Sequence, residues 1–269
     1  MLAVLLCACA LLGAATARPA LSLPRSKRAP PAYTTSSQVV PGALNIHIQP
    51  HSHNDLGWLK TFDEYLIGRN NSIQQAGVRW IYDSVVQALL RDENRRFITV
   101  EMGFLMRWLD TQPASVRADV QMLVAQDRLQ VTNGGWAMHD EATVSFTDAV
   151  DQMSLGERLV NATFGAAAAA RVAWSCDPFG HSATEGVLSA QMGHAGFFYG
   201  RLDWQEAAHQ IATNSTEYVW RPSASLGAGA QVFAGANVHG YDPVVLTDSG
   251  HPIFECVGGG GARPPPPTP

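Results

Sequence analysis

The segment from His51 to Trp58 combines two histidines, an aspartate and a tryptophan directly after an alternating apolar run, Leu44 to Gln49. Alternation of this kind predicts a strand. On extended backbone, His53 and Asp55 point to the same side because they are two positions apart. An imidazole and a carboxylate together suit a borderline cation such as Zn²⁺. The segment therefore indicates a metal site, although a polar loop with hydrogen-bonded histidines would have the same composition.

The elements that must position these residues alternate between strand and helix. Short apolar runs predict strands, and apolar residues at helical spacing predict helices. Ser72 is the expected N-cap of the first helix. Strands separated by helices are typical of βαβ units with a parallel sheet. The predicted helices cover residues 73–90, 113–126, 145–160 and 183–192, and the predicted strands cover 96–100, 129–131, 171–175 and 196–199.

Ligand sites in parallel sheets lie at the carboxyl ends of the strands. Asp177, which precedes a proline, could merely start a turn, and the Asn-Gly-Gly sequence at 133–135 could be only a turn. The convergence of several such loops at one face nevertheless favours an active site. The four loops that follow predicted strands and contain chemically active side chains are residues 51–58, 101–104, 133–141 and 176–181.

Composition limits the class of protein. The chain has 269 residues, enough for one large domain or two small ones. Hydrophobic residues make up 46% and charged residues 15%, so a sizeable core is expected. The net charge is −5 and the globular part contains no basic run, which argues against a nucleic-acid partner.

The N-terminus predicts a signal peptide over residues 1–17. Residues 2–15 are apolar but too few to span a membrane, and Ala15-Thr16-Ala17 has the small-x-small form of a cleavage site. We expect a flexible leader over 18–43 and no membrane anchor. Passage through the secretory route agrees with three glycosylation sequons, which begin at Asn70, Asn161 and Asn214.

Two cysteines, Cys176 and Cys256, remain after removal of the predicted signal peptide. Two cysteines form no disulfide framework, and the sequence leaves open whether they pair in an oxidising compartment.

Three long motifs in chain order resemble glycoside hydrolase family 38, the α-mannosidases. They are His-Ser-His-Asn-Asp-Leu-Gly-Trp at 51–58, Asn-Gly-Gly-Trp-Ala-Met-His-Asp-Glu-Ala at 133–142 and Trp-Ser-Cys-Asp-Pro-Phe-Gly-His-Ser at 174–182. Three shorter stretches, at 57–61, 150–156 and 200–205, are most similar to the lysosomal branch.

The resemblance implies a fold and an activity. The fold would be an α/β domain around an irregular parallel β-barrel, of which residues 44–257 would form an incomplete N-terminal part. The activity would be zinc-dependent, retaining removal of terminal α-D-mannose from N-glycans in glycoprotein catabolism. Mannose-containing oligosaccharides would then be the partners, and the lumen of a lysosome or vacuole the location, with secretion as the alternative.

The resemblance also implies roles for individual residues. His53 and Asp55 would be zinc ligands, and Asp177 would be both a zinc ligand and the catalytic nucleophile. Arg201 would lie beside that nucleophile and hold it ionised. The aromatic residues expected to line the mannose pocket are Trp58 and Phe179.

The sequence departs from the family pattern after Cys256. Family members continue further, and their general acid/base aspartate and fourth zinc ligand, a histidine, lie downstream of the matched region. Residues 258–269 are a low-complexity tail of glycine and proline. We therefore expect this chain to be inactive alone. The alternative is a non-catalytic truncated isoform or gene-model fragment with at most weak glycan binding.

A zinc-dependent deacetylase or amidohydrolase is the other enzyme class that His-x-His-x-Asp after a strand suits. Such an enzyme would use water as its nucleophile, whereas a mannosidase would use Asp177.

Overall fold

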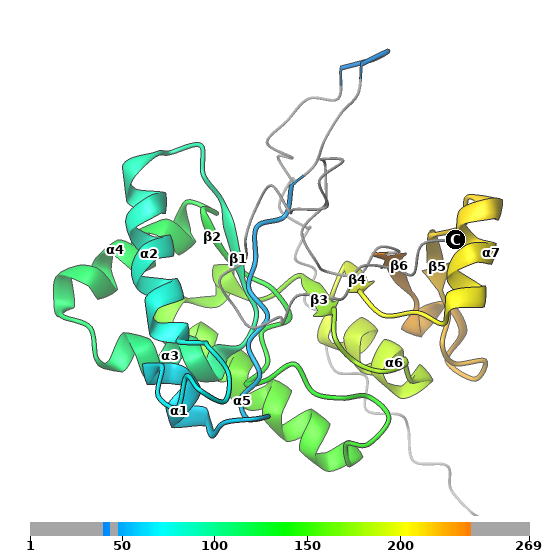
Figure 1. Cartoon of the computed structure of the whole chain (residues 1–269). Coiled ribbons are helices and arrows are strands. Elements are labelled where there is room, and N and C mark those ends of the chain that lie inside the picture. The colour runs from blue at the N-terminus through cyan, green and yellow to red at the C-terminus, as the bar shows by residue number, and fades with distance from the viewer. Residues whose placement is uncertain (1–39, 44–47, 238–269) are drawn as a thin grey trace, which may run out of the picture. The chain divides into compact units, whose positions relative to one another are not determined.

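The computed structural model describes residues 40–43 and 48–237 (Figure 1). The chain separates into two compact units, residues 1–47 and 48–269. In the first unit, the described residues form a turn in which the Ala43 N–H donates to the Val40 carbonyl at 3.2 Å. The predicted signal peptide, most of the predicted leader, Cys256 and the predicted low-complexity tail lie outside the described residues.

The first sheet of the second unit has two parallel strands, β1 (Phe97–Thr99) and β2 (Leu129–Val131), with Ile98 opposite Gln130. The strand predicted at 44–49 lies partly outside the described residues. Its described part is no strand; the chain instead forms a single parallel bridge between His51 and Ile98. That bridge is sufficient to bring the start of the motif at 51–58 to the carboxyl end of β1.

The second sheet has four strands in the order β3 (Val172–Ser175), β4 (Gly196–Tyr199), β6 (Val232–Ala236) and β5 (Glu217–Trp220). All neighbours are parallel except β5, which is antiparallel to β6. A hydrogen bond of 2.7 Å from the Asn133 N–H to the Val172 carbonyl connects the end of β2 to β3.

The ends of β1, β2, β3 and β4 are therefore neighbours in that order. The predicted α/β class is confirmed. The described residues form no closed barrel, so the barrel stays a prediction.

Seven α-helices belong to the described part of the chain (Figure 1). Five of them surround the first sheet and form the main core, in which Trp108, Tyr82 and Phe104 are almost fully buried. Burial of each such side chain contributes roughly 1.5–3 kcal/mol. The helices are α1 (Phe62–Ile67), α2 (Val78–Arg91), α3 (Met102–Asp110), α4 (Ala114–Ala125), α5 (Phe146–Phe164), α6 (Ala183–Met192) and α7 (Trp204–Thr213).

The start of α2 differs from the prediction. The helix begins at Val78 with Gly77 as its N-cap, so the predicted cap at Ser72 is wrong, and Ile73 is 56% exposed. The reason is tertiary: the buried Lys60 ammonium donates to the backbone carbonyls of Arg69 (2.8 Å) and Ala76 (3.0 Å). Because Lys60 binds both carbonyls, residues 69–76 form an irregular loop instead of the first turns of a helix.

The loop predicted at 101–104 is also different, because a helix begins inside it. Glu101 is the N-cap of α3, and Met102 and Phe104 are completely buried. The first N–H groups of a helix have no partner within it. Here the N–H groups of Met102 and Gly103 donate to the carbonyls of Gly135 (3.0 Å) and Trp136 (2.9 Å). The turn after β2 therefore anchors the start of α3.

Helix α5 packs on the same turn through Gly156. A Cβ atom at Gly156 would lie 2.1 Å from the Gly134 carbonyl oxygen and 2.5 Å from the carbonyl carbon of Gly135. Only glycine allows this close approach. Asn133 (φ 63°) and Gly134 (φ 81°) are in the left-handed region, which lets the chain turn sharply after β2.

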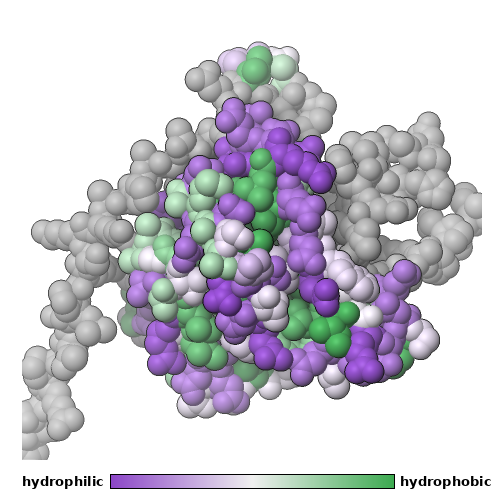
Figure 2. Space-filling model, turned by 90° about the vertical axis from the view of Figure 1, so that its left-hand side faces the viewer, coloured by the Kyte–Doolittle hydropathy of each residue, from purple (hydrophilic) through white to green (hydrophobic). Residues whose placement is uncertain are grey.

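On the face shown in Figure 2, apolar side chains form small, separate patches among hydrophilic ones. The asparagines of the three predicted sequons, Asn70, Asn161 and Asn214, are exposed to solvent. No helix in residues 40–43 and 48–237 combines the length and apolar character that crossing a membrane requires.

Candidate metal centre

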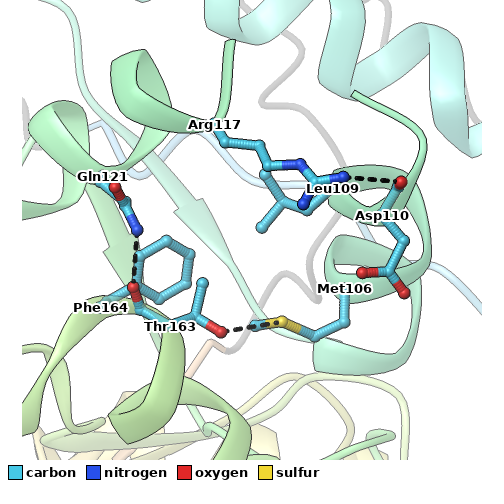
Figure 3. A pocket seen from close by; sticks show the side chains of 7 residues that line it. All are labelled: Met106, Leu109, Asp110, Arg117, Gln121, Thr163 and Phe164. Carbon is cyan, nitrogen blue, oxygen red and sulfur yellow. Dashed lines mark hydrogen bonds between the residues drawn. The ribbon is translucent and has the colours of Figure 1, made fainter. Parts of the chain in front are cut away.

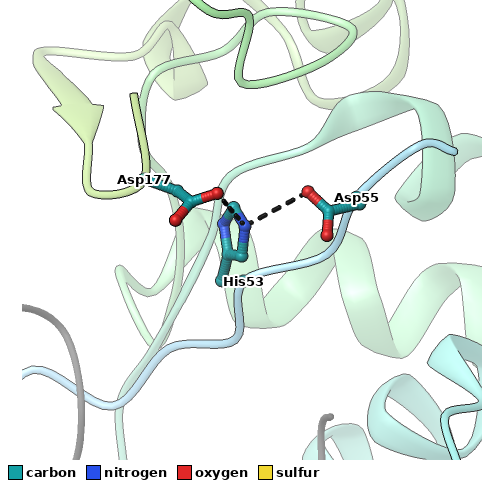
Figure 4. Close-up of side chains that lie close together, drawn as sticks. All are labelled: His53, Asp55 and Asp177. Carbon is teal, nitrogen blue, oxygen red and sulfur yellow. Dashed lines mark ion pairs between the residues drawn. The ribbon is translucent and has the colours of Figure 1, made fainter. Parts of the chain in front are cut away.

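His53 lies between two carboxylates (Figure 4). Its Nε2 is 3.3 Å from Asp55 Oδ1 and 3.3 Å from Asp177 Oδ2. One donor atom from each of these residues lies within 4.8 Å of the other two, and all three residues are half-buried. His53 and Asp55 come from the segment after the bridge to β1, and Asp177 comes from the end of β3. The structure thus brings together residues that are up to 124 positions apart in the chain.

The geometry of this cluster fits a zinc ion. Two ligands of a tetrahedral zinc ion, with bonds of about 2.0–2.1 Å, lie roughly 3.3 Å apart. The His53–Asp55 and His53–Asp177 distances have that value. One nitrogen and two oxygen donors also suit zinc. Their assignment as ligands stays a prediction, and so does the choice of zinc.

The protonation of His53 depends on Asp55 and Asp177. Burial would lower the pKa of His53, but hydrogen bonds to Asp177 and Asp55 raise it far above its ordinary value. The two carboxylates therefore favour a positive charge beside them, either a ring proton or a cation.

Behind His53 lies a buried acid, Glu101, whose side chain is 1% exposed. Its Oε1 is 3.9 Å from His53 Nδ1, and its two oxygens accept from the Asn54 backbone N–H (3.3 Å) and side-chain amide (3.2 Å). Cys176 Sγ also faces His53 Nδ1, at 3.7 Å. Burial raises the pKa of Glu101 to about 7, although the His53 charge and the Asn54 hydrogen bonds oppose this shift.

We expect Glu101→Gln to lower the affinity for Zn²⁺ by about 10- to 100-fold, the usual cost of losing a carboxylate behind a metal-binding histidine. The amide keeps the shape of the side chain but removes the negative charge that orients His53. Competition with a fluorescent zinc chelator measures the affinity. Glu157→Gln, at a half-buried glutamate of α5, is the matched control. Equal affinity in all three proteins would show that Glu101 does not support the site.

The second oxygen of Asp177 binds Arg201. Arg201 Nε donates to Asp177 Oδ1 at 2.9 Å and to the Asp177 backbone carbonyl at 2.8 Å, and one terminal nitrogen donates to Oδ1 at 2.5 Å. Charge-assisted bonds of this kind stabilise an ionised carboxylate. The strand ends can approach this closely because of Gly200, where a Cβ atom would lie 2.3 Å from the Cys176 carbonyl oxygen.

Two aromatic side chains that were expected to contact sugar are strongly exposed. Trp58 is 65% exposed and follows Asp55 by three residues; Phe179 is 72% exposed and follows Asp177 by two. The Arg201 guanidinium lies over the Phe179 ring, 4.4 Å from its centroid. The Trp58 ring and the face of the Phe179 ring that Arg201 does not cover suit a sugar ring, but their role stays a prediction.

A cavity of about 210 Å³ lies elsewhere, between α3, α4 and α5 (Figure 3). Its polar groups bind one another: Gln121 donates to the Thr163 carbonyl at 3.1 Å, and Arg117 donates to the Asp110 carbonyl at 2.9 Å. It contains none of the residues of the metal cluster.

Comparison with known proteins agrees with the motifs. The model of the glycosyl hydrolases family 38 N-terminal domain matches residues 43–251. The lysosomal alpha-mannosidase of Homo sapiens is 49% identical over 212 residues, which are 78% of this chain and 21% of the relative. A probable alpha-mannosidase of Arabidopsis thaliana is 45% identical over 78% of this chain and 20% of its own length. The chain thus spans about a fifth of the curated relatives it matches.

Among solved structures, the crystal structure of an alpha-mannosidase from Enterococcus faecalis V583 aligns with a TM-score of 0.54. The alignment covers 72% of this chain and 20% of that one, with 16% sequence identity. At this identity the likeness supports the fold alone.

Proposed function

Because the chain belongs to glycosyl hydrolase family 38, we propose that its metal centre is part of a zinc-dependent, retaining α-mannosidase site. The single observation that carries this proposal is the double engagement of Asp177. One oxygen faces His53 in the metal cluster, and the other is held by Arg201. A carboxylate in this position can be a ligand and still attack a sugar carbon.

The roles of the chain's own residues follow from their contacts. Asp177, kept ionised by Arg201, would attack the anomeric carbon and form a covalent glycosyl ester, which water then hydrolyses with retention of configuration. A second carboxyl group, about 5 Å away, must protonate the leaving oxygen. A bound zinc ion would supply electrostatic stabilisation at the sugar hydroxyl groups. Trp58 and Phe179 would present apolar faces to the C–H groups of the ring.

The proposed substrates are mannose-containing oligosaccharides of N-glycans. The names of the relatives, which include lysosomal alpha-mannosidases, support glycan catabolism in a lysosome or vacuole. Glycosylation at Asn70, Asn161 and Asn214 would accompany that route, and the exposure of all three side chains permits it. We further propose that the two open sheets belong to the irregular barrel predicted from the family resemblance.

Glycan binding without turnover is a second candidate. It is favoured by the make-up of the cluster, which has three candidate ligands in the described residues.

Trapping with a 5-fluoro-α-mannosyl fluoride tests the proposal. Because fluoride leaves without protonation by a general acid, the full chain, loaded with Zn²⁺, should acquire a mannosyl adduct that peptide mass spectrometry assigns to Asp177. Asp203→Asn is the matched control, since Asp203 caps α7 through the backbone N–H groups of Gln205 and Glu206. Mannose and zinc binding without an adduct would favour the second candidate. Hydrolysis of an N-acetyl sugar without an adduct would indicate the deacetylase class.

A further inference from the structure

The loops after β2 and β3 are joined by two crossed histidine–glutamate pairs. His181 Nδ1 lies 2.9 Å from Glu141 Oε1, and His139 Nε2 lies 3.0 Å from Glu185 Oε2. The loop after β2 contributes His139 and Glu141, the loop after β3 contributes His181, and the first turn of α6 contributes Glu185. The four side chains are nearly buried, with 1–13% of each exposed.

The two ring nitrogens of His181 both face acceptors. Nδ1 is bonded to the Glu141 carboxylate, and Nε2 is 3.0 Å from the backbone carbonyl of Arg201. A neutral imidazole has only one N–H. Both contacts are hydrogen bonds only if the ring carries two protons.

Glu141 is well placed to act as an acceptor. Besides His181, its oxygens accept from the Ser175 hydroxyl (2.7 Å) and the Ser182 backbone N–H (2.8 Å). With three donors around it, the carboxylate acts as an acceptor only, so the proton of the hydrogen bond between Glu141 and His181 lies on the ring.

We propose that His181 is a positioning residue that carries a proton on both ring nitrogens at neutral pH and fixes Arg201 and, through Arg201, the orientation of Asp177. The chain of contacts runs from Glu141 to His181, from His181 to the Arg201 carbonyl, and from the Arg201 guanidinium to Asp177. It links the ends of β2, β3 and β4. The consequence for catalysis rests on the proposed function of Asp177. The tests below measure protonation and stability, not turnover, so they can fail independently of that function.

The other groups around the ring are compatible with a positive charge. The Tyr199 ring lies 4.5 Å from the His181 ring, between centroids, and the Phe197 ring 6.0 Å. The Arg201 guanidinium is directed at Asp177 and not at His181. Burial lowers the pKa of His181, but the hydrogen bond and charge of Glu141 outweigh it and raise the pKa above the ordinary value.

The raised pKa of His181 sets the direction in which stability changes with pH. A histidine whose pKa is raised on folding contributes stability that is complete below the ordinary pKa of about 6.5. This contribution is lost as the pH rises through the pKa of the folded state. The contact between His181 and Arg201 is therefore strongest in acid.

His139 provides a matched comparison in the same protein. Its Nδ1 is 2.7 Å from the side-chain nitrogen of Gln152, whose oxygen accepts the Ala137 N–H at 3.0 Å. That arrangement makes Gln152 the donor and His139 Nδ1 an acceptor. A neutral ring with its proton on Nε2 satisfies both contacts of His139, including the one to Glu185. Burial lowers the pKa of His139 and the hydrogen bond and charge of Glu185 raise it above the ordinary value, but a proton on Nδ1 would face the Gln152 N–H, and this contact favours the neutral ring.

Nitrogen-15 NMR of the full chain at pH 7 tests the protonation state. The His181 and His139 signals are assigned from the His181→Gln and His139→Gln variants. Both His181 nitrogens should have imidazolium shifts, whereas His139 should have one unprotonated nitrogen. An unprotonated nitrogen in His181 at pH 7 would overturn the proposal.

A double-mutant cycle tests the positioning role. His181→Gln and Asp177→Asn should be coupled by about fivefold in the equilibrium constant for unfolding, although the two side chains are not in contact. His139→Gln and Asp177→Asn should be additive. If His181→Gln does not fold, Glu141→Gln replaces it in the same cycle. Additive effects of His181→Gln and Asp177→Asn, or of Glu141→Gln and Asp177→Asn where that cycle replaces the first, would overturn the role of His181.

Discussion

Asp177→Asn should abolish covalent capture of a fluorinated mannosyl substrate and, at the same time, lower the affinity for Zn²⁺ by about 100-fold or more. Loss of a supporting carboxylate already costs about 10- to 100-fold, so loss of a ligand should cost at least as much. The joint loss is expected because one carboxylate would serve both purposes: Oδ2 faces His53 and Oδ1 is bonded to Arg201. An asparagine keeps the size of the side chain but removes its charge and its nucleophilic oxygen.

The two readouts separate the two roles of Asp177. Zinc affinity is measured by competition with a fluorescent chelator, and capture is measured by the mass of the intact protein. Normal zinc affinity together with lost capture would mean that Asp177 is a nucleophile but no ligand. Normal capture would contradict the proposed mechanism. Asp203→Asn should change neither quantity, because Asp203 is engaged at the N-terminus of α7.

Gly156→Ala should destabilise the fold by about 3 kcal/mol, at the upper end of the cost of inserting a carbon atom into a packed interior. The new methyl group would meet backbone atoms of Gly134 and Gly135, which cannot rotate away. In an unhindered helix the same change would stabilise, since alanine is the better helix former by up to about 1 kcal/mol. The sign of the effect therefore tests the contact.

Urea denaturation of the full chain measures the change. Gly229→Ala is the control, because a Cβ atom there would meet nothing within 4 Å. Equal midpoints for Gly156→Ala and the parent would show that α5 does not rest on the turn after β2.

The sequence predicted the elements with strong local patterns. Helix α6 and strands β2 and β4 begin and end where the apolar spacing placed them, and β1, β3 and α4 differ by one residue at one or both ends. Helix α3 was missed because only Arg107 and Asp110 of its nine residues are exposed, and two polar residues are a weak signal of its period. Tertiary bonds from Lys60 displaced the start of α2, and no local pattern contains that information.

The candidate site was predictable to a similar degree. The spacing of His53 and Asp55 indicated a shared cation directly, whereas Asp177 depended on the family resemblance, because only the fold brings it near. The supporting acids Glu101 and Glu141 were within the loops expected to be active, but neither was singled out. Their partners lie 34–47 positions away in the chain, and a buried acid is distinguished from an exposed one only by its contacts.

The thiol of Cys176 has a practical consequence. It is completely buried between His53 and Met138, with its sulfur 3.7 Å from the imidazole. An alkylating reagent can reach this sulfur only while the surrounding loops are apart. The rate of that reaction at Cys176, followed by peptide mass spectrometry, thus measures how often the loops around the centre open.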